Sequence, residues 1–166
     1  VFISQKNFFY KDKLKIRHIS IKEANFSIQK EDFKFFNRFM NNQFSSKELK
    51  IKKSNIFFKD DSDKIILIGQ ISKLLLFHDN IKSLNKIVLD GEIFKIPFIY
   101  EFIRDFKKKE NNTLIKSKKL KLKFENKTTK IDGIINGLNE LSFLNSRLTS
   151  NYQLDDNVFS FKSKDQ

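Results

Sequence analysis

Few residues of this sequence have the types and spacing that catalysis or metal binding requires. The two histidines, His18 and His78, are sixty residues apart, and neither has a repeated carboxylate neighbour. We therefore expect a structural or surface role for both of them. The 166-residue chain contains no cysteine, which excludes a disulfide framework and a thiolate metal site.

An acidic cluster, formed by Asp60, Asp61 and Asp63, could contact a cation. It lacks the glycine and the final glutamate of a calcium-binding loop, so a solvated turn is the simpler interpretation. The four glycines never gather into a phosphate-binding loop, and no serine lies in a nucleophile elbow. The sequence therefore predicts no catalytic residue, no metal site and no cofactor, and we do not expect an enzyme.

The chain has a formal charge of +13, from 33 basic and 20 acidic residues. Such a charge can attract nucleic acid or an anionic membrane surface. Only four of the basic residues are arginines, the residue that makes bidentate contacts with phosphates and bases. We favour a solvated, lysine-rich surface that reflects the codon usage of an AT-rich genome. A functional basic surface stays open as the alternative.

The elements around these residues are expected to be strands for the most part. The chain contains 20 phenylalanines but only four glycines and one proline, and β-branched and aromatic residues favour pleated, half-buried strands. Its longest apolar stretches, Ile65–Ile68 and Leu74–Phe77, fall far short of the roughly 20 residues that a membrane helix needs. Phenylalanines at intervals of three and four predict a helix over 31–44, and a second, shorter helix could cover 79–85. The predicted fold is mainly β: an elongated, curved, mostly antiparallel repetitive sheet, an open groove, with one or two short helices.

An internal repeat is the most informative pattern in the chain. Residues 19–32 align with residues 49–62 at an offset of thirty, so that Ile21 matches Ile51 and Asn25 matches Asn55. Each copy reads as an alternating strand, a small polar break at Asn25 or Asn55, a second short strand and an acidic turn. A degraded third copy begins near Leu120. We expect one segment with repeat units near 14–47, 48–112 and 113–166, in which each unit covers its neighbour.

Three of the four glycines follow an apolar run, namely Gly69, Gly91 and Gly133. A glycine inside a strand often marks a bulge or a sharp bend. We therefore expect these glycines to form one repeated bend.

The clearest period-two patterns lie in two stretches. Residues 94–102 alternate after Gly91, although a helix using Ile99, Phe102, Ile103 and Phe106 competes with the strand there. Residues 120–124 alternate with lysines, which is typical of a sheet with one wet face. Because side chains two residues apart share a face, these stretches supply the candidate groove residues. They are Phe94, Ile96, Phe98, Tyr100, Phe102, Leu120, Leu122 and Phe124.

Residues 49–60 (LKIKKSNIFFKD) and 88–98 (VLDGEIFKIPF) resemble the AsmA-like family, which includes the TamB-type envelope proteins of Gram-negative bacteria. The shared pattern is a strand, a small residue with Asn, a strand, an acidic turn, and an apolar strand running into Gly and Pro-Phe. The resemblance covers roughly residues 14–161. It implies a curved β-sheet with an apolar inner groove. It supplies no catalytic residues.

The resemblance also implies a function and a location. Family members project into the periplasm from an inner-membrane anchor, and they are thought to help phospholipid transport or outer-membrane assembly. The chain begins at Val1, so we expect a segment of a larger protein whose anchor lies elsewhere. The expected partners are phospholipid and neighbouring repeats of the parent chain. A protein-interaction β-module and nonspecific nucleic-acid binding through the lysine-rich face are the alternatives, and nucleic acid is the less favoured partner.

Overall fold

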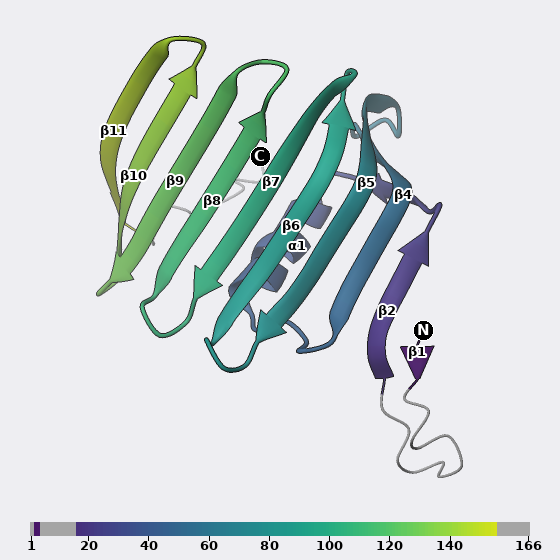
Figure 1. The fold of residues 1–166 in the computed structure, drawn as a ribbon, viewed down its shortest axis with the longest axis horizontal. Helices are drawn as coiled ribbons and strands as arrows, with labels where there is room; N and C mark the ends of the chain where they lie inside the picture. The colour runs from purple at the N-terminus through teal and green to yellow at the C-terminus, as the bar shows by residue number, and fades with distance from the viewer. Residues whose placement is uncertain (1, 4–15, 156–166) are drawn as a thin grey trace, which may run out of the picture.

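The computed structural model describes residues 2–3 and 16–155, which form one open β-sheet and one helix (Figure 1). The elements, in chain order, are β1 (Phe2–Ile3), β2 (Ile16–Lys22), β3 (Asn25–Ile28), α1 (Asp32–Asn41), β4 (Glu48–Lys59), β5 (Ile65–Asp79), β6 (Leu84–Ile93), β7 (Ile96–Asp105), β8 (Glu110–Ser117), β9 (Leu122–Ile131), β10 (Ile134–Phe143) and β11 (Ser146–Asp155). The prediction of a mainly β, open and mostly antiparallel sheet with a short helix is confirmed.

Strands β4 to β11 form a continuous antiparallel meander. The connections are short, and from β5 onwards each has two or four residues, at 80–83, 94–95, 106–109, 118–121, 132–133 and 144–145. Tight hairpin turns need left-handed backbone, which Gly, Asn and Asp adopt most easily. This glycine-poor chain uses other residues instead, such as Phe94 at φ 52° and Leu144 at φ 53°. The turn at Asp132 and Gly133, with φ 49° and 80°, has the more usual composition.

The sequence repeat corresponds to a parallel pairing at the N-terminal side of the meander. Strands β2 and β3 both run parallel to β4, with Ile21 opposite Ile51 and Asn25 opposite Asn55. The Asn55 side-chain amide donates a hydrogen bond of 3.0 Å to Oδ1 of Asn25. The thirty-residue offset is therefore the length of the crossover that carries the chain through α1 and back to a neighbouring strand.

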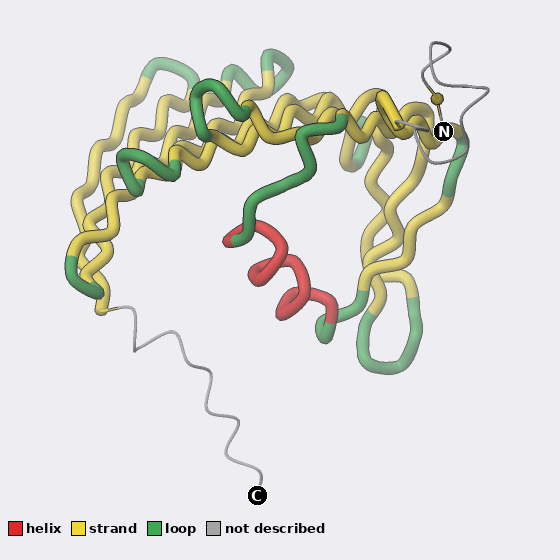
Figure 2. The backbone as a smooth tube through the Cα atoms, turned by 90° about the horizontal axis from the view of Figure 1, so that it is seen from below, coloured by secondary structure: helices red, strands yellow, loops and turns green. Residues whose placement is uncertain are grey.

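The predicted break in each repeat is an interruption of the regular pairing that lies one or two residues before the asparagine. Glu23 and Lys53, which are also thirty residues apart, both have left-handed backbone, with φ 55° and 48°. Ser54 is buried beside them, where its hydroxyl accepts from the Ala24 amide and donates to the Lys52 carbonyl. Strand β5 carries a matching extra residue at 72, which shifts its register against β6. The distortion thus crosses three neighbouring strands, and beyond it the β4–β5 hairpin curls toward the helix (Figure 2).

The three glycines do not occupy equivalent positions, so the prediction of one repeated bend is wrong. Gly91 lies opposite the bulge of β5, and a Cβ there would come within 2.7 Å of the Gln70 carbonyl oxygen. Gly69 lies in regular strand between Ile56 and Ile93. Gly133 lies in the β9–β10 turn. Similar sequence contexts therefore serve a close approach, an ordinary pairing and a turn.

Helix α1 agrees with the predicted helix over 31–44 except at its ends, because the chain leaves helical geometry at Asn42. The second predicted helix, over 79–85, is wrong. That stretch is the β5–β6 turn, in which Oδ1 of Asp79 accepts from the amides of Ile81 and Lys82. The competing helix over 99–106 is also excluded, since those residues belong mainly to β7.

The predicted third repeat copy does not share the geometry of the first two. Leu120 and Lys121 lie in the β8–β9 turn, and β9 pairs antiparallel with both neighbours without a crossover helix. The parts of the predicted units at 14–15 and 156–166 lie outside the described residues. Within the described part, the repeat is therefore confined to β2, β3 and β4.

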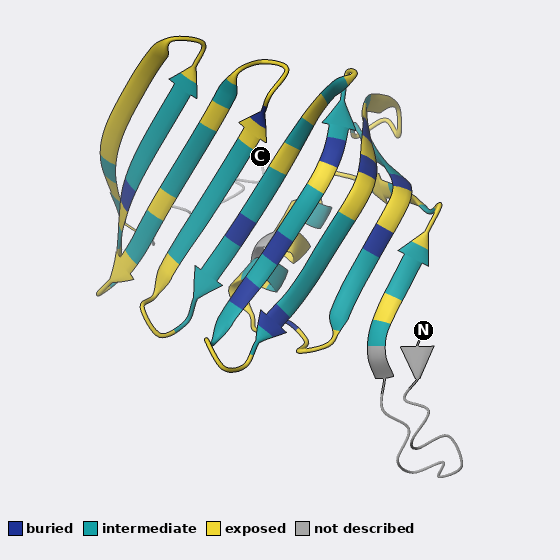
Figure 3. Ribbon diagram, in the orientation of Figure 1, coloured by how far each residue is buried: buried dark blue, intermediate teal, exposed yellow. Residues whose placement is uncertain are grey.

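The sheet is curved, and α1 lies inside the curve (Figure 2). We call the side that faces α1 the concave face and the opposite side the convex face. Buried residues are few and are concentrated between β4 and β7 (Figure 3). The core therefore lies between the concave face and the helix, and no second layer covers the rest of the sheet among the described residues.

Candidate functional site

Six of the eight predicted groove residues lie on the concave face. Phe102 packs in the core beneath α1, and Ile96, Phe98 and Tyr100 share its face because they alternate with it along β7. The register continues from Tyr100 to Ile115 on β8 and from Ile115 to Phe124 on β9. Leu122 lies on the same face as Phe124.

The other two predicted residues lie in turns. Phe94 is in the β6–β7 turn, with 76% of its surface exposed, and Leu120 is in the β8–β9 turn, with 38% exposed. Both alternate correctly in sequence, but the strands β7 and β9 begin two residues after them. Neither residue is part of the concave face.

An apolar row crosses the concave face from β4 to β11. Each member lies opposite the next in the register of neighbouring strands, and the row is formed by Ile51, Leu74, Leu89, Tyr100, Ile115, Phe124, Leu141 and Leu148. Sequence reasoning found only Tyr100 and Phe124. The others lie in strands whose concave positions also include Gly, Ser or Asn, which weakens the alternation.

Charge is segregated between the two faces. From β4 to β11, Arg104 and Lys130 are the only Lys, Arg, Asp or Glu residues that the register places on the concave face. The other charged strand residues alternate onto the convex face, where ion pairs join Lys123 to Glu125 at 3.0 Å and Arg147 to Glu140 at 3.2 Å. The concave face therefore carries few charges and combines apolar positions with Asn, Ser and Thr, while the convex face carries most of the charged strand residues.

Helix α1 covers the concave face between β5 and β7. Phe44, just after the helix, is buried with Ile87 and Phe102, and Phe39 stacks on Phe44 with ring centroids 4.7 Å apart. Phe35, one turn earlier in the helix, stacks on Phe39 with ring centroids 6.1 Å apart and is 63% exposed. One stacked aromatic series thus runs from solvent at Phe35 to the core at Phe44.

A buried polar cluster fixes the segment that follows α1. Asn85 is fully buried, and its Oδ1 accepts from the Phe44 amide at 3.0 Å while its Nδ2 donates to the Asn42 carbonyl at 2.8 Å. His78 lies 2.9 Å from the same Oδ1 through Nδ1. Because this oxygen only accepts, Nδ1 of His78 carries a proton. The cluster has a structural role, and sequence reasoning had no signal that joined His78 to Asn85.

Arg104 anchors the end of the helix to β7. Its guanidinium donates a hydrogen bond of 2.6 Å to the Asn41 side chain and lies 5.3 Å from the centre of the Phe106 ring. Partial burial lowers the pKa of Arg104 from its ordinary value. The one arginine on the concave face between β4 and β11 is therefore engaged by the protein itself.

The concave face beyond β7 has no cover among the described residues. Its polar positions pair across strands: Asn126 donates to Asn139 at 2.6 Å and to the Tyr152 hydroxyl at 2.8 Å. The Tyr152 ring lies over Gly137, where a Cβ would overlap it. Leu148 is 64% exposed. This half of the face therefore combines an uncovered apolar row with polar side chains that hydrogen-bond to one another across the strands.

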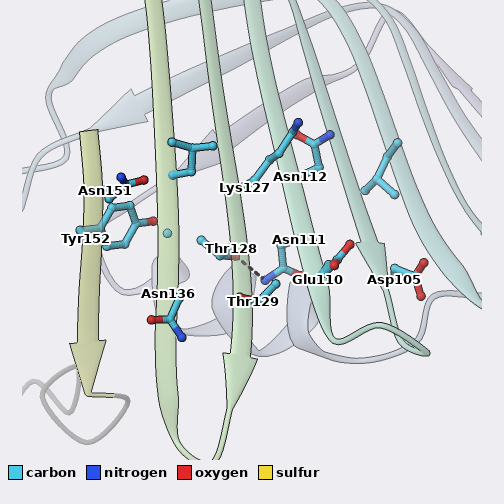
Figure 4. Close-up of a pocket in the computed structure, with 13 residues that line it drawn as sticks. Asp105, Glu110, Asn111, Asn112, Lys127, Thr128, Thr129, Asn136, Asn151 and Tyr152 are labelled. Carbon is cyan, nitrogen blue, oxygen red and sulfur yellow. Dashed lines mark hydrogen bonds between the residues drawn. The ribbon is translucent and has the colours of Figure 1, made fainter. Parts of the chain in front are cut away.

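A hollow of about 670 Å³ spans strands β7 to β11 (Figure 4). Most of its lining side chains belong to the convex face, including Lys127, Asp105 and Glu110. Asn112 contributes a buried Oδ1 without a hydrogen-bond partner, and on the opposite face Asn111 donates to Thr128 at 3.3 Å. The hollow is an open depression between strands, in which Asp105 on β7 lies opposite Glu110 on β8.

The predicted acidic cluster closes the β4–β5 turn. Oδ1 of Asp60 accepts from both the amide and the hydroxyl of Ser62, and these bonds lower the pKa of Asp60. Asp63 forms an ion pair of 2.8 Å with Lys59, which lowers the pKa of Asp63. The described part of the chain contains no group of three His, Asp or Glu side chains that could hold a metal ion.

Of the residues that the structure describes, none belongs to a helix with the length and apolar character needed to cross a bilayer. Comparison of the chain with protein-family models, with curated proteins and with solved structures gives no significant match.

Proposed function

We propose that this chain is a non-enzymatic section of a lipid-handling protein that holds phospholipid acyl chains against the concave face of its sheet. The observation that carries the proposal is the segregation of charge, which leaves one face of eight neighbouring strands with only Arg104 and Lys130 as charged strand residues. Acyl chains gain about 0.8 kcal/mol for each methylene that leaves water, and they need an uncharged surface of this kind.

The uncovered half of the face is the proposed lipid site. Ile115, Phe124 and Leu141 lie side by side there, and each remains partly accessible. Their row continues into the half that α1 covers, at Tyr100. The site would thus take an extended chain lying across the strands.

The resemblance to AsmA-like envelope proteins agrees with this proposal in fold and in the position of the groove. From it we carry over, as parts of the same proposal, a periplasmic location, an anchor in another segment of the parent protein, and a role in outer-membrane assembly or lipid homeostasis. The convex face alternates lysines with carboxylates, as the Lys123–Glu125 pair illustrates, which does not favour nucleic acid as the partner.

The test uses two adjacent residues on opposite faces of β8. Ile115→Lys places a charge in the apolar row, whereas Leu114→Lys places the same charge on the convex face, between Glu101 and Glu125. Phospholipid that copurifies with the purified chain is measured by mass spectrometry. We expect lipid with the original sequence and with Leu114→Lys, and its loss with Ile115→Lys.

Three other outcomes would contradict the proposal. Absence of lipid from the unmodified chain, or equal lipid content in both variants, removes the concave face as the site. Stable self-association without lipid, abolished by Phe98→Asp or Phe124→Asp, would favour the interaction module instead. Circular dichroism of both lysine variants checks that each retains its strands.

A further inference from the structure

Three turns lie next to one another at one end of the sheet. They connect β6 to β7, β8 to β9 and β10 to β11, and the alternation of the meander brings them to the same end (Figure 1). We call residues 94–95, 118–121 and 144–145 the basic rim. Nζ of Lys119 donates to the Lys95 carbonyl at 2.7 Å, so the first two turns are joined directly.

The basic rim carries positive charge without compensation. It contains four lysines and no acidic residue, and the strand residues that flank its turns are uncharged. At the opposite end, the turns 80–83, 106–109 and 132–133 also contain four lysines. There, four carboxylates offset them, in Asp79, Asp105, Glu110 and Asp132. The β4–β5 turn, at the same end as the rim, contains Asp60, Asp61 and Asp63 with Lys64, so the uncompensated positive charge belongs to the three turns of the basic rim and not to the whole end of the sheet.

Each turn of the basic rim also exposes a large apolar side chain. Phe94 is 76% exposed, Leu144 is 61% exposed and Leu120 is 38% exposed. Phe94 and Leu144 have left-handed backbone, which is unfavourable for an ordinary residue and which Asn or Gly would adopt at less cost. The opposite end uses Asp132 and Gly133 in a turn of the same length. Backbone geometry therefore does not explain the apolar residues of the rim.

On β6 and β7 the concave face becomes more apolar toward this end. Its last positions before the basic rim include Ile93, Ile96 and Phe143. Toward the opposite end, the corresponding positions of β6, β7 and β8 are Asn85, Arg104 and Asn111. The apolar surface of the concave face is thus continuous with the exposed tips of the rim. At its other end the positions on β6 to β9 are polar or charged, and only β10 and β11 place apolar residues there, Ile135 and Leu154.

We propose that the basic rim docks on the surface of an anionic phospholipid bilayer. Phe94, Leu120 and Leu144 enter the headgroup region, while the lysines contact lipid phosphates. Lysine near an anionic surface and amphipathic insertion of apolar side chains act together in such contacts. The docked sheet presents the apolar end of its concave face to the membrane. Docking of the rim can be measured on its own. The role of the docked orientation, which is to bring the concave face to the membrane, rests on the proposed function.

A single tryptophan reports insertion, since the chain contains none. Phe94→Trp places the probe in the rim, and Ile81→Trp places it at the opposite end, where Ile81 is 89% exposed. Vesicles of equal parts phosphatidylglycerol and phosphatidylcholine are added to each variant of the full chain. We expect a blue shift and quenching by brominated lipid for Phe94→Trp only. An unshifted spectrum for this variant, or an equal shift for both, overturns the proposal.

Two matched charge variants test the lysines. Lys119→Gln with Lys121→Gln alters the rim, and Lys107→Gln with Lys109→Gln removes the same charge at the opposite end. The pairs are equivalent in structure, because Lys119 and Lys107 each donate to a neighbouring turn and Lys121 and Lys109 each have left-handed backbone. We expect the rim pair to weaken vesicle binding roughly tenfold to thirtyfold and the control pair to change it little.

Equal weakening by the two pairs would mean attraction through net charge alone, and would overturn the proposal. Pure phosphatidylcholine vesicles should bind no variant strongly, since they lack the anionic charge. Copurified phospholipid is measured on the same samples. Rim variants that keep their copurified lipid but lose vesicle binding would show that docking by the rim is distinct from lipid binding on the concave face. Failure of the lipid proposal would show instead as lipid-free protein that still binds vesicles.

Discussion

The concave face consists of two halves built from the same residue types but with different surroundings. On β7, Phe102 lies beneath α1 and is 8% exposed, and it belongs to the core with Phe44 and Ile87. On β10 and β11, Phe143 is 44% exposed and Leu148 is 64% exposed. The alternation of apolar residues along each strand produces the concave face, while the position of α1 determines which part of that face is buried as core.

This difference separates stability from binding. Burial against α1 uses the apolar side chains of one half for folding, so those side chains are not free to contact a ligand. The other half stays in the sheet through backbone pairing and polar contacts such as Asn126 to Asn139. Substitutions in the two halves should therefore act on different properties of the protein.

The largest expected effect comes from truncating one phenylalanine in each half. Phe102→Ala removes a buried ring and should lower the free energy of unfolding by about 3–5 kcal/mol. Phe124→Ala, on the same face but only partly buried, should cost roughly half as much or less. Urea unfolding followed by circular dichroism measures both changes. Equal losses would mean that the half beyond β7 also has a core-like environment.

A second effect distinguishes the polar clusters of the two halves. Asn85→Ala leaves the Phe44 amide and the His78 side chain without their shared acceptor, and should cost about 2–4 kcal/mol. Asn139→Ala breaks contacts at a partly exposed site where water can replace them, and should cost about 1 kcal/mol or less. Thermal unfolding of the two variants gives the ranking. The reverse order would show that α1 does not depend on Asn85 for its position.

The smallest expected effect is a change of stability at alkaline pH. Burial raises the pKa of Tyr100 above its ordinary 10.0, because the tyrosinate form is poorly solvated beside the core. The contribution of this group is therefore complete below pH 10 and is lost as pH rises through the raised folded-state value. Tyr100→Phe should remove that part of the alkaline loss. An unchanged pH profile of unfolding in this variant would place Tyr100 in a more solvated site than the covered half implies.

Much of this architecture follows from patterns that the sequence displays. Period-two alternation predicted that Ile96, Phe98, Tyr100 and Phe102 share one face, and the spacing of phenylalanines predicted α1. Both patterns report local geometry, which the chain imposes on itself over a few residues. The alternation fails as a predictor only at turns, because Phe94 and Leu120 continue the period-two pattern but do not belong to a strand.

Features that depend on distant partners could not be predicted in this way. The alignment of Asn25 with Asn55 was visible, but repetition alone does not show that the copies lie side by side in parallel. The contact between His78 and Asn85 requires the register of β5 against β6, which the mistaken helix over 79–85 would have prevented. The similar sequence contexts of the glycines wrongly predicted one repeated bend. Gly91 lies close to a carbonyl oxygen of the neighbouring strand, whereas Gly133 lies in a turn.

The parallel pairing of β2 and β3 with β4 has a consequence for the order of folding. Hairpins such as β6–β7 and β9–β10 close over turns of two residues, so their ends meet at small entropic cost. The pairing of β3 with β4 requires thirty residues of separation and a formed α1 before its contacts are gained. We therefore expect the meander to form the folding nucleus and the N-terminal strands to attach last. Refolding followed by pulsed hydrogen exchange would then protect the amides of β6 to β9 before those of β2 and β3.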